Sequence, residues 1–257
     1  MAAAGPLGVD VRGRAMKTIG LIGGMSWEST AEYYRLVNEF TRDRLGGLHS
    51  ARCVLYSVDF AEIEQLQVQG RWAEAGEVLA AAAQALEAAG ADLVLICTNT
   101  MHKVADRVEA AVSIPLLHLA DATARAVRAS GLHRVGLLGT AFTMEQDFYR
   151  GRLEAGGLEV RVPDADGRAL VHRVIYQELC LGVVREESRA AYRKVIADLV
   201  AGGAQGVILG CTEIELLIRP EDSPVPVFAT ARIHAAAAVD AALSGGPGDA
   251  PPAPAPH

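Results

Sequence analysis

Two stretches of this chain end an apolar run on side chains that can do chemistry. In the first, Leu93–Ile96 is followed by a thiol, two hydroxyls, an amide and an imidazole, between Cys97 and His102. In the second, Val207–Leu209 is followed by Gly210-Cys211-Thr212-Glu213. Short apolar runs of this kind are typical of strands buried on both faces of a parallel sheet. Because ligands bind at the carboxyl ends of such strands, both stretches are candidate sites.

The two stretches share a lead-in, Gly90-Ala91 and Gly203-Ala204, and aligning these pairs shifts the chain by 113 residues. The alignment places Thr98 opposite Cys211, and Cys97 opposite a glycine. Two acid/base groups that flank one carbon suit the removal of a proton from one face and its delivery to the other. A thiolate is a competent base once its pKa is lowered. The alternative for Cys211 is a buried structural thiol.

Adjacent residues of a strand point to opposite faces, so Cys97 and Thr98 should not both face a substrate. We predict that Thr98 faces the site and that Cys97 packs in the core. A threonine hydroxyl is a far weaker base than a thiolate and needs an activating partner. His102, four residues further on, is a possible proton relay; the alternative is a surface or capping histidine.

Composition excludes several classes of function. The 257 residues carry a formal net charge of −7 with no basic block, which argues against nucleic acid as a partner. No apolar run reaches the length of a membrane span, and no secretory segment is evident near the start. The four cysteines are scattered without metal-type spacing, which predicts no metal site. We expect reduced thiols and a cytoplasmic protein.

Strand and helix patterns alternate along the chain, which indicates βαβ units and an α/β fold with parallel sheets. Because Lys17–Gly23 resembles His133–Gly139, we expect two similar α/β domains related by a pseudo-two-fold, with the site in the cleft between them. One continuous doubly wound sheet is the alternative. The expected domains are 16–118 plus 225–244, and 119–224. Residues 1–15 and the proline-rich 245–257 read as a disordered extension and a disordered tail.

The strands are expected at 18–22, 53–58, 93–98, 115–119, 135–138, 207–210 and 225–228. The helices are expected near 28–44, 72–89, 102–111, 121–131, 144–155, 168–181, 186–201, 214–218 and 230–243.

The chain resembles the Asp/Glu/hydantoin racemase superfamily, and within it the aspartate/glutamate racemases, over about residues 17 to 243. The motifs that carry the resemblance are Gly20–Ser26, Cys97–His102, Leu137–Thr140 and Gly210–Glu213. The resemblance implies two α/β domains with the active site between them, and an amino-acid substrate, aspartate and/or glutamate. It also implies a 1,1-proton transfer at Cα by two bases without pyridoxal phosphate or any other cofactor, and a homodimer.

The chain departs from the family pattern at one base. Family members usually carry cysteine immediately before Asn-Thr, where this chain has Thr98. Three outcomes stay open: a racemase that uses Thr98 through His102 or water, an enzyme that works well from one enantiomer only, or an enzyme of other Cα chemistry. Competing functions are a hydantoin racemase, a malonate-type decarboxylase, or a catalytically silent amino-acid-binding protein.

An acidic amino acid brings two carboxylates and an ammonium. Glu213 is expected to hold the ammonium, and Arg52, where the resemblance places a binding arginine, the distal carboxylate. The binding lysine that the resemblance implies is missing, since Leu179–Leu181 occupies that region. The remaining expected contacts are side-chain donors to a carboxylate and a turn where backbone approaches the ligand closely. These residues are Asn99, Thr100, Thr140, Thr143, Thr212, Gly24 and Met25.

Overall fold

In a computed structural model the chain divides into two units. A short buried strand, β1 (Ile19–Gly23), lies at the centre of the first unit. The structure describes residues 16–244, so the predicted disordered extension and tail lie outside the described residues. Within the described residues, one unit consists of 16–95, Asp106–Leu117 and 235–244. The other consists of Ile96–Ala105 and His118–His234.

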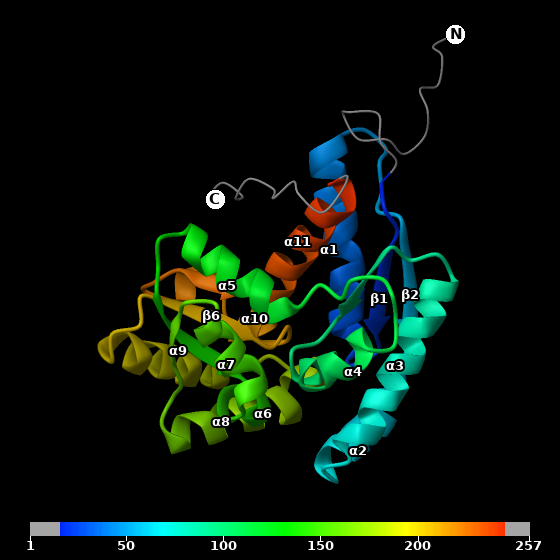
Figure 1. Cartoon of the computed structure of the whole chain (residues 1–257). Coiled ribbons are helices and arrows are strands. Elements are labelled where there is room, and N and C mark those ends of the chain that lie inside the picture. The colour runs from blue at the N-terminus through cyan, green and yellow to red at the C-terminus, as the bar shows by residue number, and fades with distance from the viewer. Residues whose placement is uncertain (1–15, 245–257) are drawn as a thin grey trace. The chain divides into compact units, whose positions relative to one another are not determined.

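The first unit is built on a three-stranded sheet with the strand order β2-β1-β3, in which β1 and β2 run parallel. Every residue of β1 and β3 is buried, as expected for strands covered on both faces. Helices α1 and α11 lie side by side (Figure 1) and are joined by an ion pair between Arg44 and Asp240. The elements are β2 Cys53–Ser57, β3 Leu93–Ile96, α1 Trp27–Leu45, α2 Phe60–Val68, α3 Trp72–Ala88, α4 Ala105–Glu109 and α11 Thr230–Leu243, whose residues up to His234 belong to the second unit.

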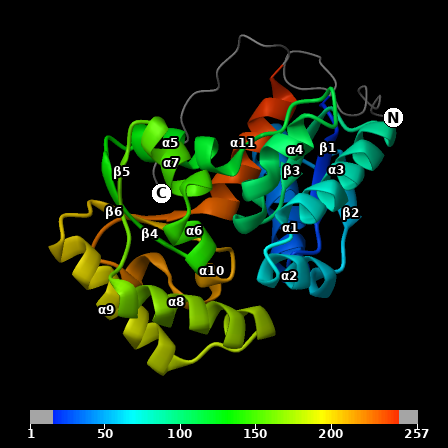
Figure 2. The ribbon, with the colours of Figure 1, turned by 60° about the horizontal axis from the view of Figure 1, so that its bottom comes forward.

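The second unit has a four-stranded sheet with the order β5-β4-β6-β7, and each neighbouring pair is parallel. Alternate residues of the central strands enter two different cores. Leu138 and Leu209 pack with α8 and α9, whereas Leu137 and Ile208 pack with α5 and α7. Figure 2 shows these two pairs of helices on opposite sides of β4 and β6.

The elements of this unit are β4 Arg134–Gly139, β5 Glu159–Arg161, β6 Gly206–Gly210, β7 Val227–Ala229, α5 Leu119–Ala129, α6 Ala141–Glu145, α7 Asp147–Ala155, α8 Ala165–Gln177, α9 Glu186–Ala201 and α10 Ile214–Leu217. Short 3-10 helices span Thr100–Val104, Leu179–Leu181 and Pro220–Asp222.

Most of the predicted elements are present, and the differences have local causes. The predicted strand 115–119 is reduced to an isolated bridge between Val94 and Leu116, because α5 already begins at Leu119 with His118 as its N-cap. The predicted helix 102–111 is a 3-10 turn followed by the short α4. Helix α2, capped by Asp59, and strand β5 were not predicted.

The division into units differs from the predicted domains in two places. Ile96–Ala105 belongs with the second unit, and the chain returns to the first unit after His234 instead of after residue 224. Hydrogen bonds explain this difference, since Asn99 binds Thr230 and Thr100 binds Thr140 within the second unit. The predicted α/β class with parallel sheets is confirmed. The pseudo-two-fold and the cleft stay predictions. Among residues 16–244 no helix is long and apolar enough to cross a membrane.

Candidate active site

Cys211 follows directly after β6 and is 8% exposed. Its thiol donates a hydrogen bond to the Glu213 carboxylate, with Sγ 2.9 Å from Oε2. The Thr212 hydroxyl donates to the same oxygen at 2.8 Å. The three residues of the predicted second motif therefore form one hydrogen-bonded group around a buried carboxylate, since Glu213 is only 6% exposed.

The thiol form of Cys211 is favoured in this environment. Burial and the neighbouring Glu213 charge raise the pKa of Cys211 well above its usual range. Cys211 therefore holds its proton at neutral pH, and it can act as a base only after the proton has moved away. Glu213 already accepts a hydrogen bond from this thiol and is the nearest acceptor for that proton.

The first motif follows the end of β3, and its first two residues differ in burial as the alternation along a strand predicts. Cys97 is completely buried, whereas Thr98 is partly exposed. Both Thr98 and Cys211 belong to the second unit. Cys97 therefore packs in the core, and Thr98 is the residue of this pair with access to solvent.

A chain of hydrogen bonds connects the two motifs. The Asn99 Nδ2 donates to Thr230 Oγ1 at 3.2 Å, and the Thr230 hydroxyl donates to the Leu209 carbonyl at 2.8 Å. Because the only hydroxyl proton of Thr230 is used on Leu209, Thr230 can only accept from Asn99, which fixes the orientation of the amide. The Asn99 Oδ1 is then a buried acceptor without a partner among the described residues.

The predicted carboxylate donors Thr100, Thr140 and Thr143 are brought together, but they bond to one another. Thr140 Oγ1 lies 3.1 Å from Thr100 Oγ1 and 3.2 Å from Thr143 Oγ1, and all three residues are buried. Thr140 is also the N-cap of α6 and accepts the Thr143 N–H. This cluster attaches the first motif to the end of β4.

Both ring nitrogens of His102 are engaged by backbone. Nε2 accepts the Leu119 N–H at 3.2 Å, so the proton resides on Nδ1, which donates to the Thr98 carbonyl at 2.8 Å. Burial lowers the pKa of His102 to about 4, so the ring is neutral at pH 7. The ring therefore holds the Thr98 backbone in place. A relay through His102 would require one of these bonds to break, and it stays a prediction.

Three predicted binding residues lie in the first unit. A Cβ at Gly24 would lie 2.1 Å from the Val58 carbonyl oxygen, so the close approach at this turn is to the protein's own backbone, whereas a ligand was predicted there. Met25 is buried and Arg52 is exposed. Their expected role in binding stays a prediction.

Sequence reasoning missed three residues of this site: Thr230, His118 and His234. The rings of His118 and His234 lie 4.5 Å and 5.8 Å from that of His102, measured between centroids. Thr230 follows directly after β7, so the rule that polar residues at carboxyl ends of strands are site candidates would have found it. No group of three metal-ligating side chains suited to hold an ion occurs in the stretch 16–244.

The thiol, the carboxylate and the hydroxyl cluster follow the carboxyl ends of parallel strands, which is where α/β proteins of this class bind their ligands. The family model of Asp/Glu/Hydantoin racemase matches residues 22–238, and the chain belongs to this family.

Known proteins of this family resemble the chain over most of its length. The crystal structure of a "putative Asp/Glu Racemase from Yersinia pestis" is 59% identical, with a TM-score of 0.84, and covers 89% of this chain and 100% of its own. An aspartate racemase homologue from Pyrococcus horikoshii is 37% identical, with a TM-score of 0.79 and the same coverage. The broad specificity amino-acid racemase RacX of Bacillus subtilis is 20% identical over 82% of this chain and 91% of its own.

Proposed function

We propose that this protein is an amino-acid racemase that acts on aspartate, glutamate or both. The reaction is a 1,1-proton transfer at Cα without a cofactor, in which Cys211 serves one face of the substrate and Thr98 the other. The family supports the reaction class, and the names of two related proteins, an Asp/Glu racemase and an aspartate racemase homologue, support the acidic substrate.

The observation that carries the proposal is the hydrogen-bonded chain from Asn99 through Thr230 to the Leu209 carbonyl. Leu209 lies two residues before Cys211, and Asn99 directly follows Thr98. These hydrogen bonds therefore connect the two segments that carry the proposed acid/base residues to one buried hydroxyl. Such ties hold catalytic groups in a fixed geometry, which is what a transfer between two faces of one carbon requires.

Glu213 is proposed to accept the thiol proton of Cys211 when Cys211 acts as the base. When Cys211 acts as the acid, the thiol delivers its proton to the substrate carbanion and becomes a thiolate. When Cys211 acts as the base, its proton first passes to Glu213, and the resulting thiolate removes the α-proton. The raised pKa of Cys211 keeps the resting thiol protonated, so the base role begins with this transfer to Glu213.

Asn99 is proposed to bind the substrate ammonium, in addition to Glu213. Its buried Oδ1 has no donor among the described residues, and an ammonium group supplies up to three. A buried acceptor left without a donor is unfavourable by about 1–3 kcal/mol, so a ligand that supplies one gains affinity. This assignment changes the expected role of Asn99 from a donor to a carboxylate into an acceptor.

Because Thr98 is a weak base, the two enantiomers should react at different rates. Cys211 should work well on the enantiomer whose α-proton faces it, and reprotonation from the Thr98 side should be slow. Equal initial turnover of L- and D-enantiomers would contradict this one-sided form.

The test is exchange of the α-proton in D₂O, followed by NMR, with L- and D-aspartate and L- and D-glutamate offered separately. Cys211→Ala should lower exchange by about 10²–10⁴-fold, the usual contribution of a general acid/base group, whereas Cys97→Ala should keep it. Deuterated product of inverted configuration would establish racemisation. Loss of exchange in Cys97→Ala but not in Cys211→Ala would overturn the assignment of the base.

Absence of exchange with all four amino acids would reject the proposed activity. Conversion of hydantoins or arylmalonates by the same protein would then identify another reaction of the superfamily. Saturable binding of aspartate or glutamate without exchange would identify a silent binding protein.

A further inference from the structure

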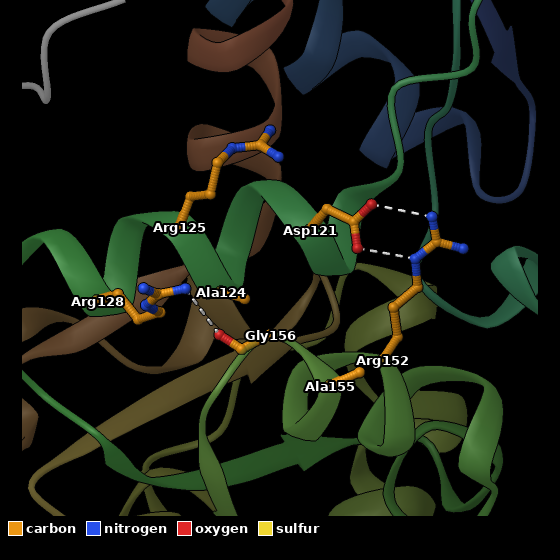
Figure 3. Close-up of a pocket in the computed structure, with 7 residues that line it drawn as sticks. All are labelled: Asp121, Ala124, Arg125, Arg128, Arg152, Ala155 and Gly156. Atoms are coloured by element: carbon orange, nitrogen blue, oxygen red, sulfur yellow. Dashed lines mark hydrogen bonds and ion pairs between the residues drawn. The ribbon is translucent and has the colours of Figure 1, made fainter. Parts of the chain in front are cut away.

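A pocket of about 330 Å³ lies on the second unit, and neither Cys211 nor Thr98 lines it. Helices α5 and α7 form its walls, and Figure 3 shows the side chains that line it. The lining residues are Asp121, Ala124, Arg125, Arg128, Arg152, Ala155 and Gly156. The volume is at the lower end of the range for small-molecule sites.

The pocket owes its shape to small residues where the two helices approach each other. A Cβ at Gly156 would lie 2.7 Å from the Ala124 Cβ, so only glycine allows this approach. Ala155 adds only a methyl group to the lining. The long side chains of the pocket are therefore the charged ones, which line it from both helices.

The charges of the pocket are unbalanced. Three arginines line it together with a single carboxylate residue, Asp121. Arg152 uses both oxygens of that carboxylate, with Nε 2.8 Å from Oδ1 and one terminal nitrogen 2.9 Å from Oδ2. The pocket thus carries two surplus positive charges on a chain whose formal net charge is −7.

The position of Arg125 explains why its positive charge is not neutralised by Asp121. Arg125 follows Asp121 by four residues on α5, a spacing at which an acid and a base normally pair on a helix surface. Because Arg152 binds both oxygens of the Asp121 carboxylate, this pairing is lost, and Figure 3 shows the Arg125 side chain rising from α5 without a bond to Asp121. No hydrogen bond or ion pair joins the exposed Arg125 guanidinium to any other residue in the range 16–244.

Arg128 keeps most of its donors as well. One terminal nitrogen donates to the Gly156 carbonyl at 3.3 Å, which holds the guanidinium over the pocket without neutralising its charge. Guanidinium groups bind phosphate and carboxylate groups through paired parallel hydrogen bonds. We propose that the α5–α7 pocket binds a small dianion, either a phosphate group or a dicarboxylate, through Arg125 and Arg128.

The test uses the full chain labelled with ¹⁵N and titrated with inorganic phosphate and, separately, with succinate at constant ionic strength in sodium chloride. We expect saturable NMR shifts of the backbone amides of 124–128 and 152–156. The double variant Arg125→Gln/Arg128→Gln should raise the Kd at least about tenfold, since it removes both unneutralised guanidinium groups. Arg42→Gln, which removes an exposed arginine at the end of α1, is the matched control and should leave the Kd unchanged.

Saturation by phosphate alone identifies a phosphate-bearing ligand, and saturation by succinate identifies a dicarboxylate; either supports the proposal. Shifts that do not saturate, or that are the same in the double variant, overturn it. Arg125→Lys keeps the charge but not the paired bonds, and should weaken binding less than the double variant. Succinate binding at the proposed catalytic site would shift the amides of Thr98 and Cys211 instead, and none of these readouts requires turnover.

Discussion

The Cys211 thiol and the Glu213 carboxylate share a hydrogen bond of 2.9 Å in a buried setting, and the Thr212 hydroxyl donates to the same carboxylate oxygen. A negative charge at this distance opposes formation of a second one on sulfur, and burial strengthens the opposition. The pair therefore holds a single proton, and the chemistry of Cys211 depends on where that proton lies.

Replacing Glu213 by glutamine should make Cys211 more acidic. The amide retains a hydrogen-bond acceptor but removes the charge that raises the pKa of Cys211. The pH titration of the Cys211 ¹³Cβ resonance should shift to lower pH in Glu213→Gln. Glu221→Gln, at an exposed site, is the control and should not move it. A midpoint that stays or rises in Glu213→Gln would rule out the electrostatic role.

Thr230→Val should loosen the connection between the two motifs. The substitution keeps the shape but leaves the Leu209 carbonyl and the Asn99 amide without a partner, which should lower the free energy of unfolding by about 1–3 kcal/mol. Because Asn99 loses its anchor, the KM for the amino-acid substrate should rise about tenfold, equivalent to about 1.4 kcal/mol. Thr230→Ser keeps the hydroxyl and should behave like the wild type. Equal KM values for valine and serine variants would contradict the anchoring role.

Acid should destabilise the protein through its buried histidines. Burial lowers the pKa of His102 to about 4 and that of His118 to about 2. The unfolded chain takes up protons near pH 6.5, whereas folded His102 does so only near pH 4. The difference favours the unfolded chain once the pH falls below 6.5. Between pH 6.5 and pH 4 the free energy of unfolding should therefore decrease by at most about 3 kcal/mol.

Urea unfolding at a series of pH values measures this effect. In His102→Gln the free energy of unfolding should fall less steeply between pH 6.5 and pH 4 than in the wild type. The exposed His133→Gln variant is the control and should retain the wild-type slope. An unchanged slope in His102→Gln would show that His102 does not stay neutral in the folded protein.

Gly24→Ala should destabilise the protein more than a comparable substitution in open space. Gly24 has a φ of +89°, and an added Cβ would meet the Val58 backbone at 2.1 Å. Gly182 has a φ of +70° with nothing within 4 Å, so Gly182→Ala carries only the conformational penalty of about 1 kcal/mol. Thermal unfolding should show a larger loss for Gly24→Ala. Equal losses would mean that the turn after β1 shifts to accept the methyl group.

Local patterns were sufficient to predict most elements and the chemical residues at their ends. The apolar runs before Cys97 and Cys211 predicted β3 and β6 because strands covered on both faces need continuous apolar residues. Strand alternation also predicted that Cys97 is buried and Thr98 is not. Helix α2 has a mixed polar pattern, and β5 is only three residues long, so neither has a clear local signal.

Residue type and spacing along the chain determined the family and the candidate acid/base pair. Only the tertiary structure decided which partners these groups have, because hydrogen bonds between distant residues depend on where strands end in space. Asn99 and Thr230 are 131 positions apart and meet in one bond. His102, predicted as a relay, has both ring nitrogens on backbone atoms. Arg125, four residues after Asp121, is left unpaired because Arg152 arrives from another helix and takes the carboxylate.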